Sequence, residues 1–192
     1  METTSAVYLD LDQETLDREY SPGAGLPDPA APLDGYARDS AAVRAGRPWQ
    51  TYAYGDLPVE RLDFYPAAVP DAPLHVFVPG GFWCVPGRST YAFPAPGLLR
   101  YGAAFATLDH GTAPTYRFDE MAAMVRRSLA WLVDNASALG VDPRRIYVSG
   151  SAGGAHLLAM CLTTTVDAED GDPRDLADLV CGVSLLSGVY DL

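Results

Sequence analysis

The sequence contains no lysine: all 13 of its basic residues are arginine, against 25 acidic residues. The absence of lysine excludes Schiff-base and lysine-base chemistry within this chain. The formal net charge of −12 argues against nucleic acid and anionic membrane as partners, because both bind a basic surface. No apolar run approaches the length of a transmembrane helix, and the acidic N-terminus has no signal-peptide pattern. We therefore expect a cytoplasmic protein.

Cysteine is scarce as well. Cys84, Cys161 and Cys181 are widely spaced and include no C-x-x-C pair, so the sequence predicts neither a disulfide framework nor a cysteine-based metal site. Cys161 and Cys181 lie in apolar runs, which places both in the predicted core. We expect no metal and no cofactor.

A chain of 192 residues is long enough for one sizeable domain. Residues 1–48 are polar, with proline and glycine concentrated between 21 and 35. We expect this segment to wrap the domain and to contain short helices near residues 13–19 and 36–45. Residues 49–192 are expected to form the domain itself.

Within residues 49–192, apolar runs alternate with helical patterns. The predicted strands span residues 61–65, 74–78, 103–108, 146–149 and 180–186. The predicted helices span residues 118–139, closed by Gly140, and 155–162. Continuous apolar runs are typical of strands that are covered on both faces. The sequence therefore predicts an α/β fold with a doubly wound, mostly parallel sheet.

Residues 142–157 form the most informative motif, because they combine a strand, a glycine turn and a helix. This is the setting of a nucleophile elbow, G-x-S-x-G, in which a serine stands on a strained turn above the sheet. Gly150 and Gly154 have the required spacing, and the residue midway between them is Ala152. Taking Ser151 as the nucleophile is the alternative, and it replaces the first glycine by serine. A phosphate-binding turn is a third interpretation, although no G-x-G-x-x-G accompanies it.

A second motif, Pro79-Gly80-Gly81-Phe82-Trp83, follows a predicted buried strand. A glycine pair at this place lets backbone N–H groups face the nucleophile and stabilise an oxyanion. The predicted oxyanion-hole donors are Gly81, Phe82 and Gly153. Four side chains near this loop are expected to line a substrate pocket: Trp83, Tyr91, His110 and Tyr116. We expect His75 to lie in the core and His156 to pack at the start of its helix.

These motifs make the chain similar to the kynurenine formamidase (arylformamidase)-like branch of the α/β-hydrolases. The matching segments are Leu16-Asp17-Arg18-Glu19-Tyr20, Arg61-Leu62-Asp63-Phe64-Tyr65-Pro66, residues 79–83, residues 142–157 and Ser187-Gly188-Val189-Tyr190-Asp191-Leu192. The resemblance implies an α/β-hydrolase fold, a serine at position 152, and hydrolysis of a small aromatic formamide or ester. Two positions depart from the family pattern: Pro79 stands where histidine is usual, and Ala152 stands where serine is expected.

The resemblance also places the triad acid and histidine after the nucleophile, on loops of later strands. We therefore expect the C-terminal strands and helices of the fold to be absent from this sequence. The expected function is that of an arylformamidase- or esterase-type serine hydrolase, inactive as written. The alternative is a non-catalytic relative that binds a small aromatic ligand or a partner chain. An uncovered strand at residues 180–186 favours a homodimer or a complementing C-terminal chain.

Overall fold

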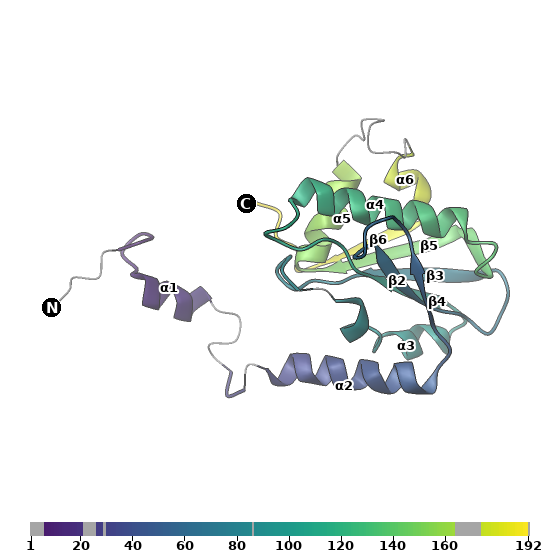
Figure 1. The fold of residues 1–192 in the computed structure, drawn as a ribbon, viewed down its shortest axis with the longest axis horizontal. Coiled ribbons are helices and arrows are strands. Elements are labelled where there is room, and N and C mark those ends of the chain that lie inside the picture. Colours follow the sequence, from purple (N-terminus) through teal and green to yellow (C-terminus); the bar gives the residue numbers. More distant parts are fainter. Residues whose placement is uncertain (1–5, 21–25, 29, 86, 164–173, 192) are drawn as a thin grey trace.

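The computed structural model describes residues 6–20, 26–28, 30–85, 87–163 and 174–191. It contains a sheet in the strand order β1-β2-β4-β3-β5-β6 (Figure 1). The strands are β1 (Gln50–Ala53), β2 (Arg61–Tyr65), β3 (Ala72–Val78), β4 (Ala104–Leu108), β5 (Val141–Ser151) and β6 (Gly182–Leu186). β2 is antiparallel to both of its neighbours, whereas β4, β3, β5 and β6 pair in parallel. This is the predicted mostly parallel α/β sheet.

Helices cover both faces of the sheet (Figure 1). One face carries α4 (Phe118–Asp134), α5 (Gly153–Thr163) and α6 (Leu176–Leu179). The other carries α2 (Ala31–Gly46), α3 (Ala95–Leu99) and the 3-10 helix η1 (Arg88–Thr90). The remaining helix, α1 (Gln13–Tyr20), has no buried residue. No described helix is long and apolar enough to cross a membrane.

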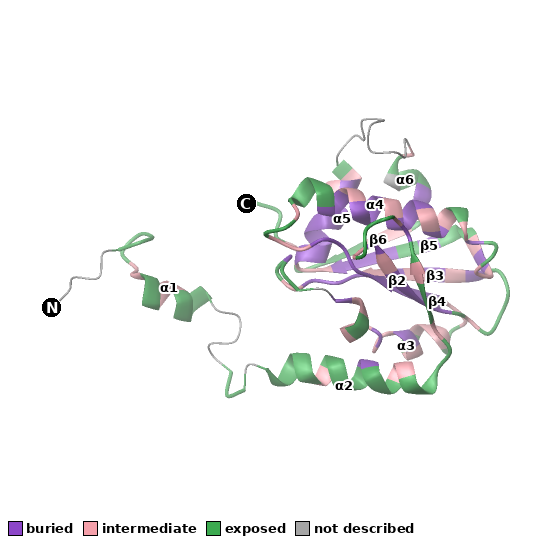
Figure 2. Cartoon of the chain, in the orientation of Figure 1, coloured by how far each residue is buried: buried purple, intermediate pink, exposed green. Residues whose placement is uncertain are grey.

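The core is divided by the sheet into a large and a small cluster. The large cluster joins the sheet to α4 and α5 through side chains such as Leu74, Val76, Met121 and Leu157. The small cluster lies on the α2 side and contains Tyr65, Ala92, Ala95 and Phe105. All of β4 is buried, and α2 is mostly exposed (Figure 2). Burial on this scale is the main stabilising term in the fold.

The predicted strands and helices are all present, and β1, η1, α3 and α6 are present in addition. β1 was not predicted, because its residues are mostly exposed and form no apolar run. The helix predicted over residues 118–139 ends at Asp134, since Asn135 leaves the helical region and the chain turns through Gly140 before β5. Cys181 is exposed rather than buried, because it precedes the edge strand β6; Cys161 is buried as predicted.

Candidate active site

Ala152 occupies the turn between β5, which ends at Ser151, and α5, which begins at Gly153. Its φ is +48°, in the left-handed region, which costs an L-residue roughly 1–2 kcal/mol. Two backbone hydrogen bonds hold it there. The Ala152 N–H donates to the Leu186 carbonyl at 2.9 Å, and its carbonyl accepts from His156 N–H at 3.0 Å. This is the strand–turn–helix geometry of a nucleophile elbow.

The two flanking glycines are required by close backbone contacts. A Cβ added at Gly150 would lie 2.7 Å from the Ala155 nitrogen. A Cβ added at Gly154 would lie 2.2 Å from the carbonyl oxygen of Val78. Side chains larger than hydrogen are therefore excluded on both sides of the turn, and the residue at its centre is Ala152. Ser151 stays on the strand, paired with Leu186 of β6.

The loop that follows β3 lies directly against the elbow. A Cβ added at Gly80 would be 2.7 Å from the Ser151 carbonyl oxygen and 3.3 Å from the Ala152 Cβ. Gly81, Phe82 and Trp83 then adopt three consecutive positive φ angles, of +114°, +54° and +56°. The two non-glycine residues cost on the order of 1–3 kcal/mol each, so the surrounding structure must hold them in place. Backbone strain of this kind concentrates at functional sites.

Trp83 connects this loop to the first residue of α5. Its indole Nε1 donates to the Gly153 carbonyl at 3.1 Å. The ring packs edge-on against His156 at 5.2 Å and tilted against Phe118 at 4.9 Å. The side chain is 7% exposed, so Trp83 holds the site together from within the core. The neighbouring Phe82, by contrast, is 71% exposed.

The other predicted pocket residues lie in three different environments. Tyr116 packs on Gly111 and lines a groove of about 530 Å³, together with Ala113, Arg117, Phe118, Asp119 and Met160. His110 is buried, and its Nδ1 lies 2.7 Å from the Gly111 carbonyl oxygen. Tyr91 packs with Tyr36, Phe77 and Phe93 on the α2 side of the sheet. The role of Tyr91 in a substrate pocket therefore stays a prediction.

The three histidines share one electrostatic property. Burial lowers the pKa of His75, His110 and His156, which favours neutral rings near pH 7. His75 is not fully buried, and its Nε2 lies 2.7 Å from Ser149 Oγ. His156 packs at the start of α5, as predicted, and its Nδ1 has no hydrogen-bond partner among the described residues. None of the three forms an ion pair with a carboxylate in the described part of the chain.

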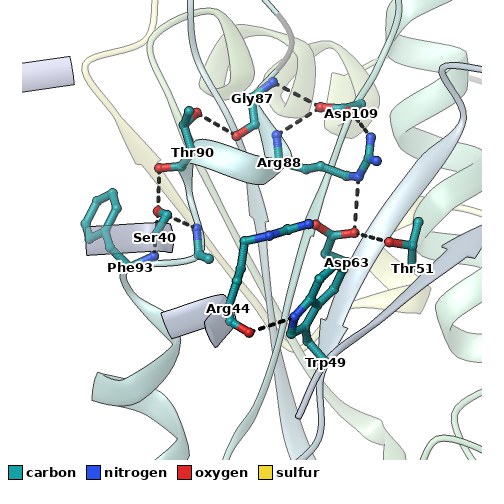
Figure 3. A network of polar contacts seen from close by, with 11 residues as sticks. Ser40, Arg44, Trp49, Thr51, Asp63, Gly87, Arg88, Thr90, Phe93 and Asp109 are labelled. Carbon is teal, nitrogen blue, oxygen red and sulfur yellow. Dashed lines mark hydrogen bonds and ion pairs between the residues drawn. The ribbon is translucent and has the colours of Figure 1, made fainter. Parts of the chain in front are cut away.

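A network of buried charges lies beneath the exit of the loop (Figure 3). Asp63 of β2, which is fully buried, pairs with Arg44 of α2 and with Arg88 of η1. Arg88 also pairs with Asp109, the residue after β4. Thr51 Oγ1 donates to Asp63 at 2.6 Å. This network was not predicted from the sequence, although Asp63 inside the buried strand of residues 61–65 was the available signal, because a buried charge requires a partner.

No three histidine, cysteine, aspartate or glutamate side chains gather as metal ligands would in the described residues. The site therefore consists of an elbow with a methyl group at its centre, a strained glycine loop against it, and an apolar groove beside Phe118. Such an arrangement can bind and orient a carbonyl group. The centre of this turn is where the nucleophilic serine of an α/β-hydrolase elbow is predicted, and here that position is Ala152.

Comparison with known proteins identifies the relatives of this site. Kynurenine formamidase of Danio rerio is 30% identical over 194 residues, covering 96% of this chain and 63% of the relative. The isoprenylcysteine alpha-carbonyl methylesterase ICME of Arabidopsis thaliana is 32% identical over 115 residues, covering 59% of this chain and 27% of that protein. This chain thus spans less than two thirds of the length of the kynurenine formamidases it matches.

Solved structures share the fold. A candidate thioesterase from Silicibacter sp. TM1040 superposes with a TM-score of 0.76 at 25% identity, covering 92% of this chain and 64% of that one. Esterase 2 of Thermogutta terrifontis gives a TM-score of 0.62 at 21% identity, covering 73% and 57%. The BD-FAE family model matches residues 62–178, which include the loop and the elbow. The chain therefore belongs to the BD-FAE family and has the α/β-hydrolase fold, and it is similar in sequence to the kynurenine formamidases.

Proposed function

We propose that this chain is an arylformamidase- or esterase-type hydrolase framework that binds a small aromatic formamide or ester without turning it over. The proposal rests on one observation: Ala152 holds the strained central position of the elbow, and its side chain is a methyl group. A methyl group cannot attack a carbonyl, so no covalent intermediate can form at this position. Loss of the nucleophilic serine from a catalytic triad costs roughly 10⁶-fold in rate.

The proposed binding mode uses the backbone of the loop and of the elbow. The substrate carbonyl carbon lies above the Ala152 methyl group, and its oxygen points toward the N–H groups of Gly81, Phe82 and Gly153. The contact between Gly80 and the elbow supports this arrangement, because it brings the loop against Ala152. Backbone donors of this type stabilise the charge that develops on the oxygen, and they also orient an uncharged carbonyl.

The groove beside α4 would take the aromatic part of the ligand. Tyr116, Phe118 and Met160 line it, and Phe118 contacts Trp83 of the loop. Apolar walls with few polar groups are typical of small-molecule sites. The names of the relatives support the ligand class, since they include kynurenine formamidases and esterases.

A partner chain is the second candidate ligand. Leu185 and Leu186 of β6 are exposed, as are Val189 and Tyr190 beyond it. An exposed apolar strand edge can pair with a strand from another chain. A second copy of this chain, or a complementing C-terminal chain, would cover these side chains. Sedimentation velocity tests the first of these: a monomer at all concentrations would contradict the homodimer.

Binding and turnover should be measured separately on the 192-residue chain. We expect formanilide, a simple aryl formamide, to bind saturably in isothermal titration, and p-nitrophenyl acetate to be hydrolysed no faster than by buffer. The variant Ala152→Ser should also stay inactive in this chain, because none of the three histidines is paired with a carboxylate in the described residues, as the base of a triad would be. Ala159→Ser, about two turns further along α5, is the matched control.

Each other outcome has a defined meaning. Absence of formanilide binding would contradict the proposal. Turnover by the unmodified chain would contradict it too, and its loss in Ser151→Ala would assign the nucleophile to Ser151. Turnover that appears only in Ala152→Ser would show that a base is present after all, with position 152 as the nucleophile position.

A further inference from the structure

The strained loop needs restraints at both of its ends, and two consecutive residues contact both. The loop leaves β3 after Val78 and ends where η1 begins at Arg88. Its two ends lie side by side, since a Cβ added at Gly87 would be 2.4 Å from the Pro79 Cβ. Asp109 and His110, which directly follow β4, lie next to this junction.

Asp109 binds the exit of the loop. Its Oδ1 accepts the backbone N–H groups of Gly87 at 3.0 Å and Arg88 at 2.9 Å. Its other oxygen pairs with the Arg88 guanidinium (Figure 3). The Asp109 carbonyl accepts a hydrogen bond from the hydroxyl of the buried Tyr54. A single carboxylate thus fixes two consecutive peptide units and the side chain of one of them.

His110 contacts the entry of the loop. Its ring is buried, and it interacts with the backbone carbonyls of Gly111 and Pro79. Pro79 is the first residue after β3 and has no N–H group of its own, so its carbonyl is its only backbone hydrogen-bonding group. The ring therefore lies close to the peptide unit from which Gly80 and Gly81 start.

The charges around Asp109 are paired in a way that makes the exit rigid. The side chains of Asp63 and Asp109 are 0% and 8% exposed, and both bind Arg88. Arg44 completes the neutralisation of Asp63 and connects the network to α2. Removing one member would leave a buried charge without its partner, which is strongly unfavourable.

Helix α2 restrains the residues that follow the exit. Ser40, the buried residue of α2, donates from its hydroxyl to the Thr90 carbonyl at 2.7 Å. The same oxygen accepts from the N–H groups of Ala92 at 3.0 Å and Phe93 at 3.1 Å. The loop exit is therefore held from β4 and from the N-terminal part of the chain at once.

We propose that Asp109 and His110 are positioning residues that hold the left-handed turn of residues 81–83 in place, Asp109 from the loop exit at residues 87–88 and His110 from the loop entry at residue 79. The inference rests on the proposed function only in naming this loop as the oxyanion loop. Neither side chain need touch the substrate. Their effect is to keep the Gly81 and Phe82 N–H groups aimed at the elbow.

Hydrogen–deuterium exchange on the 192-residue chain without ligand tests this directly. We expect Asp109→Ala to accelerate exchange of the Gly87 and Arg88 amides by roughly tenfold or more, as loss of hydrogen bonds to a charged group implies. Amides of β5 and α5 should keep their wild-type exchange. His110→Phe should accelerate exchange in residues 80–85, whereas His110→Gln, which keeps a donor, should restore protection.

The matched control is Glu60→Gln. Glu60 is also a buried carboxylate, and in the described part of the chain its oxygens bind Arg127 of α4 and the Leu57 N–H rather than the loop. Wild-type exchange of residues 80–88 in Asp109→Ala would overturn the proposal. The proposal would also be overturned if Asp109→Ala accelerated exchange equally in all helices and strands, or if Glu60→Gln accelerated exchange of the loop as much. Either result would indicate that Asp109 only stabilises the fold as a whole. The readout needs no ligand, so a failure of formanilide binding would count against the proposed function alone.

Discussion

The indole Nε1 of Trp83 lies 3.1 Å from the carbonyl oxygen of Gly153, so the loop after β3 and the helix after β5 are joined by a hydrogen bond across 70 residues of sequence. The contact is tight, because a Cβ added at Gly153 would lie 3.0 Å from the same nitrogen. The two segments predicted to supply oxyanion donors are thus fixed relative to each other by one side chain.

Trp83→Phe should lower the free energy of unfolding by about 1–3 kcal/mol. The variant keeps an aromatic ring against His156 and Phe118, but it removes the indole donor to the Gly153 carbonyl and part of the buried ring volume. Urea unfolding followed by circular dichroism gives the value. Trp131→Phe, in the partly buried side chain that packs on Tyr52, is the control. Equal losses in the two variants would argue against a special role for the Trp83 hydrogen bond.

Gly154→Ala should destabilise the chain by about 3 kcal/mol or more, because its methyl group would meet backbone oxygens that cannot move independently of β3. Gly97→Ala, in α3, is the matched control. A Cβ at Gly97 meets nothing within 4 Å, so this variant should be neutral or stabilising by up to roughly 1 kcal/mol. Thermal unfolding of both proteins distinguishes the cases, and a well-folded Gly154→Ala variant would contradict the elbow geometry.

Stability should fall as the pH is lowered below about 6.5. The folded-state pKa values of His75, His110 and His156 are lowered by burial, so the unfolded chain binds protons first. The stability that the neutral histidines contribute is fully present above their pKa in the unfolded chain. It is lost as the pH falls toward their lower pKa values in the folded chain. Urea unfolding at several pH values between 5 and 8 measures the slope. His156→Phe should reduce this slope, and an unchanged slope would show that His156 is not responsible.

Two of the three thiols should react rapidly with Ellman's reagent in the native protein. Cys84 and Cys181 are exposed, whereas burial raises the pKa of Cys161 to about 12 and keeps it as an unreactive thiol. The third thiol should react only after denaturation. Cys161→Ala should leave the native count at two and lower the denatured count to two. A native count of three would place Cys161 at the surface.

The elbow could be read from the sequence because its glycines are required by contacts within a short stretch of chain. Gly150 and Gly154 meet the backbone of neighbouring residues or of β3, and no other residue type fits. The apolar strands were equally visible, since burial on both faces leaves a continuous pattern. These features depend on local sequence or on a single neighbouring strand.

The charge network and the side of the sheet on which Tyr91 packs could not be predicted in the same way. Arg88 pairs with Asp63 and Asp109, which come from two other strand regions, and an arginine at position 88 has no local signature. The stacking of Tyr91 near Tyr36 depends on where α2 lies over the sheet. Such contacts follow from the assembled fold.

The backbone conformation at Ala152 is fixed by neighbouring residues and does not depend on the side chain at position 152. Gly150, Gly154 and the hydrogen bond to Leu186 set the turn, so position 152 presents whichever side chain it carries at the same point beside Gly80. Alanine and serine codons of the GCN and UCN type differ by one base. A hydroxyl could therefore be gained or lost at this point by a single nucleotide change, with no accompanying rearrangement of the fold.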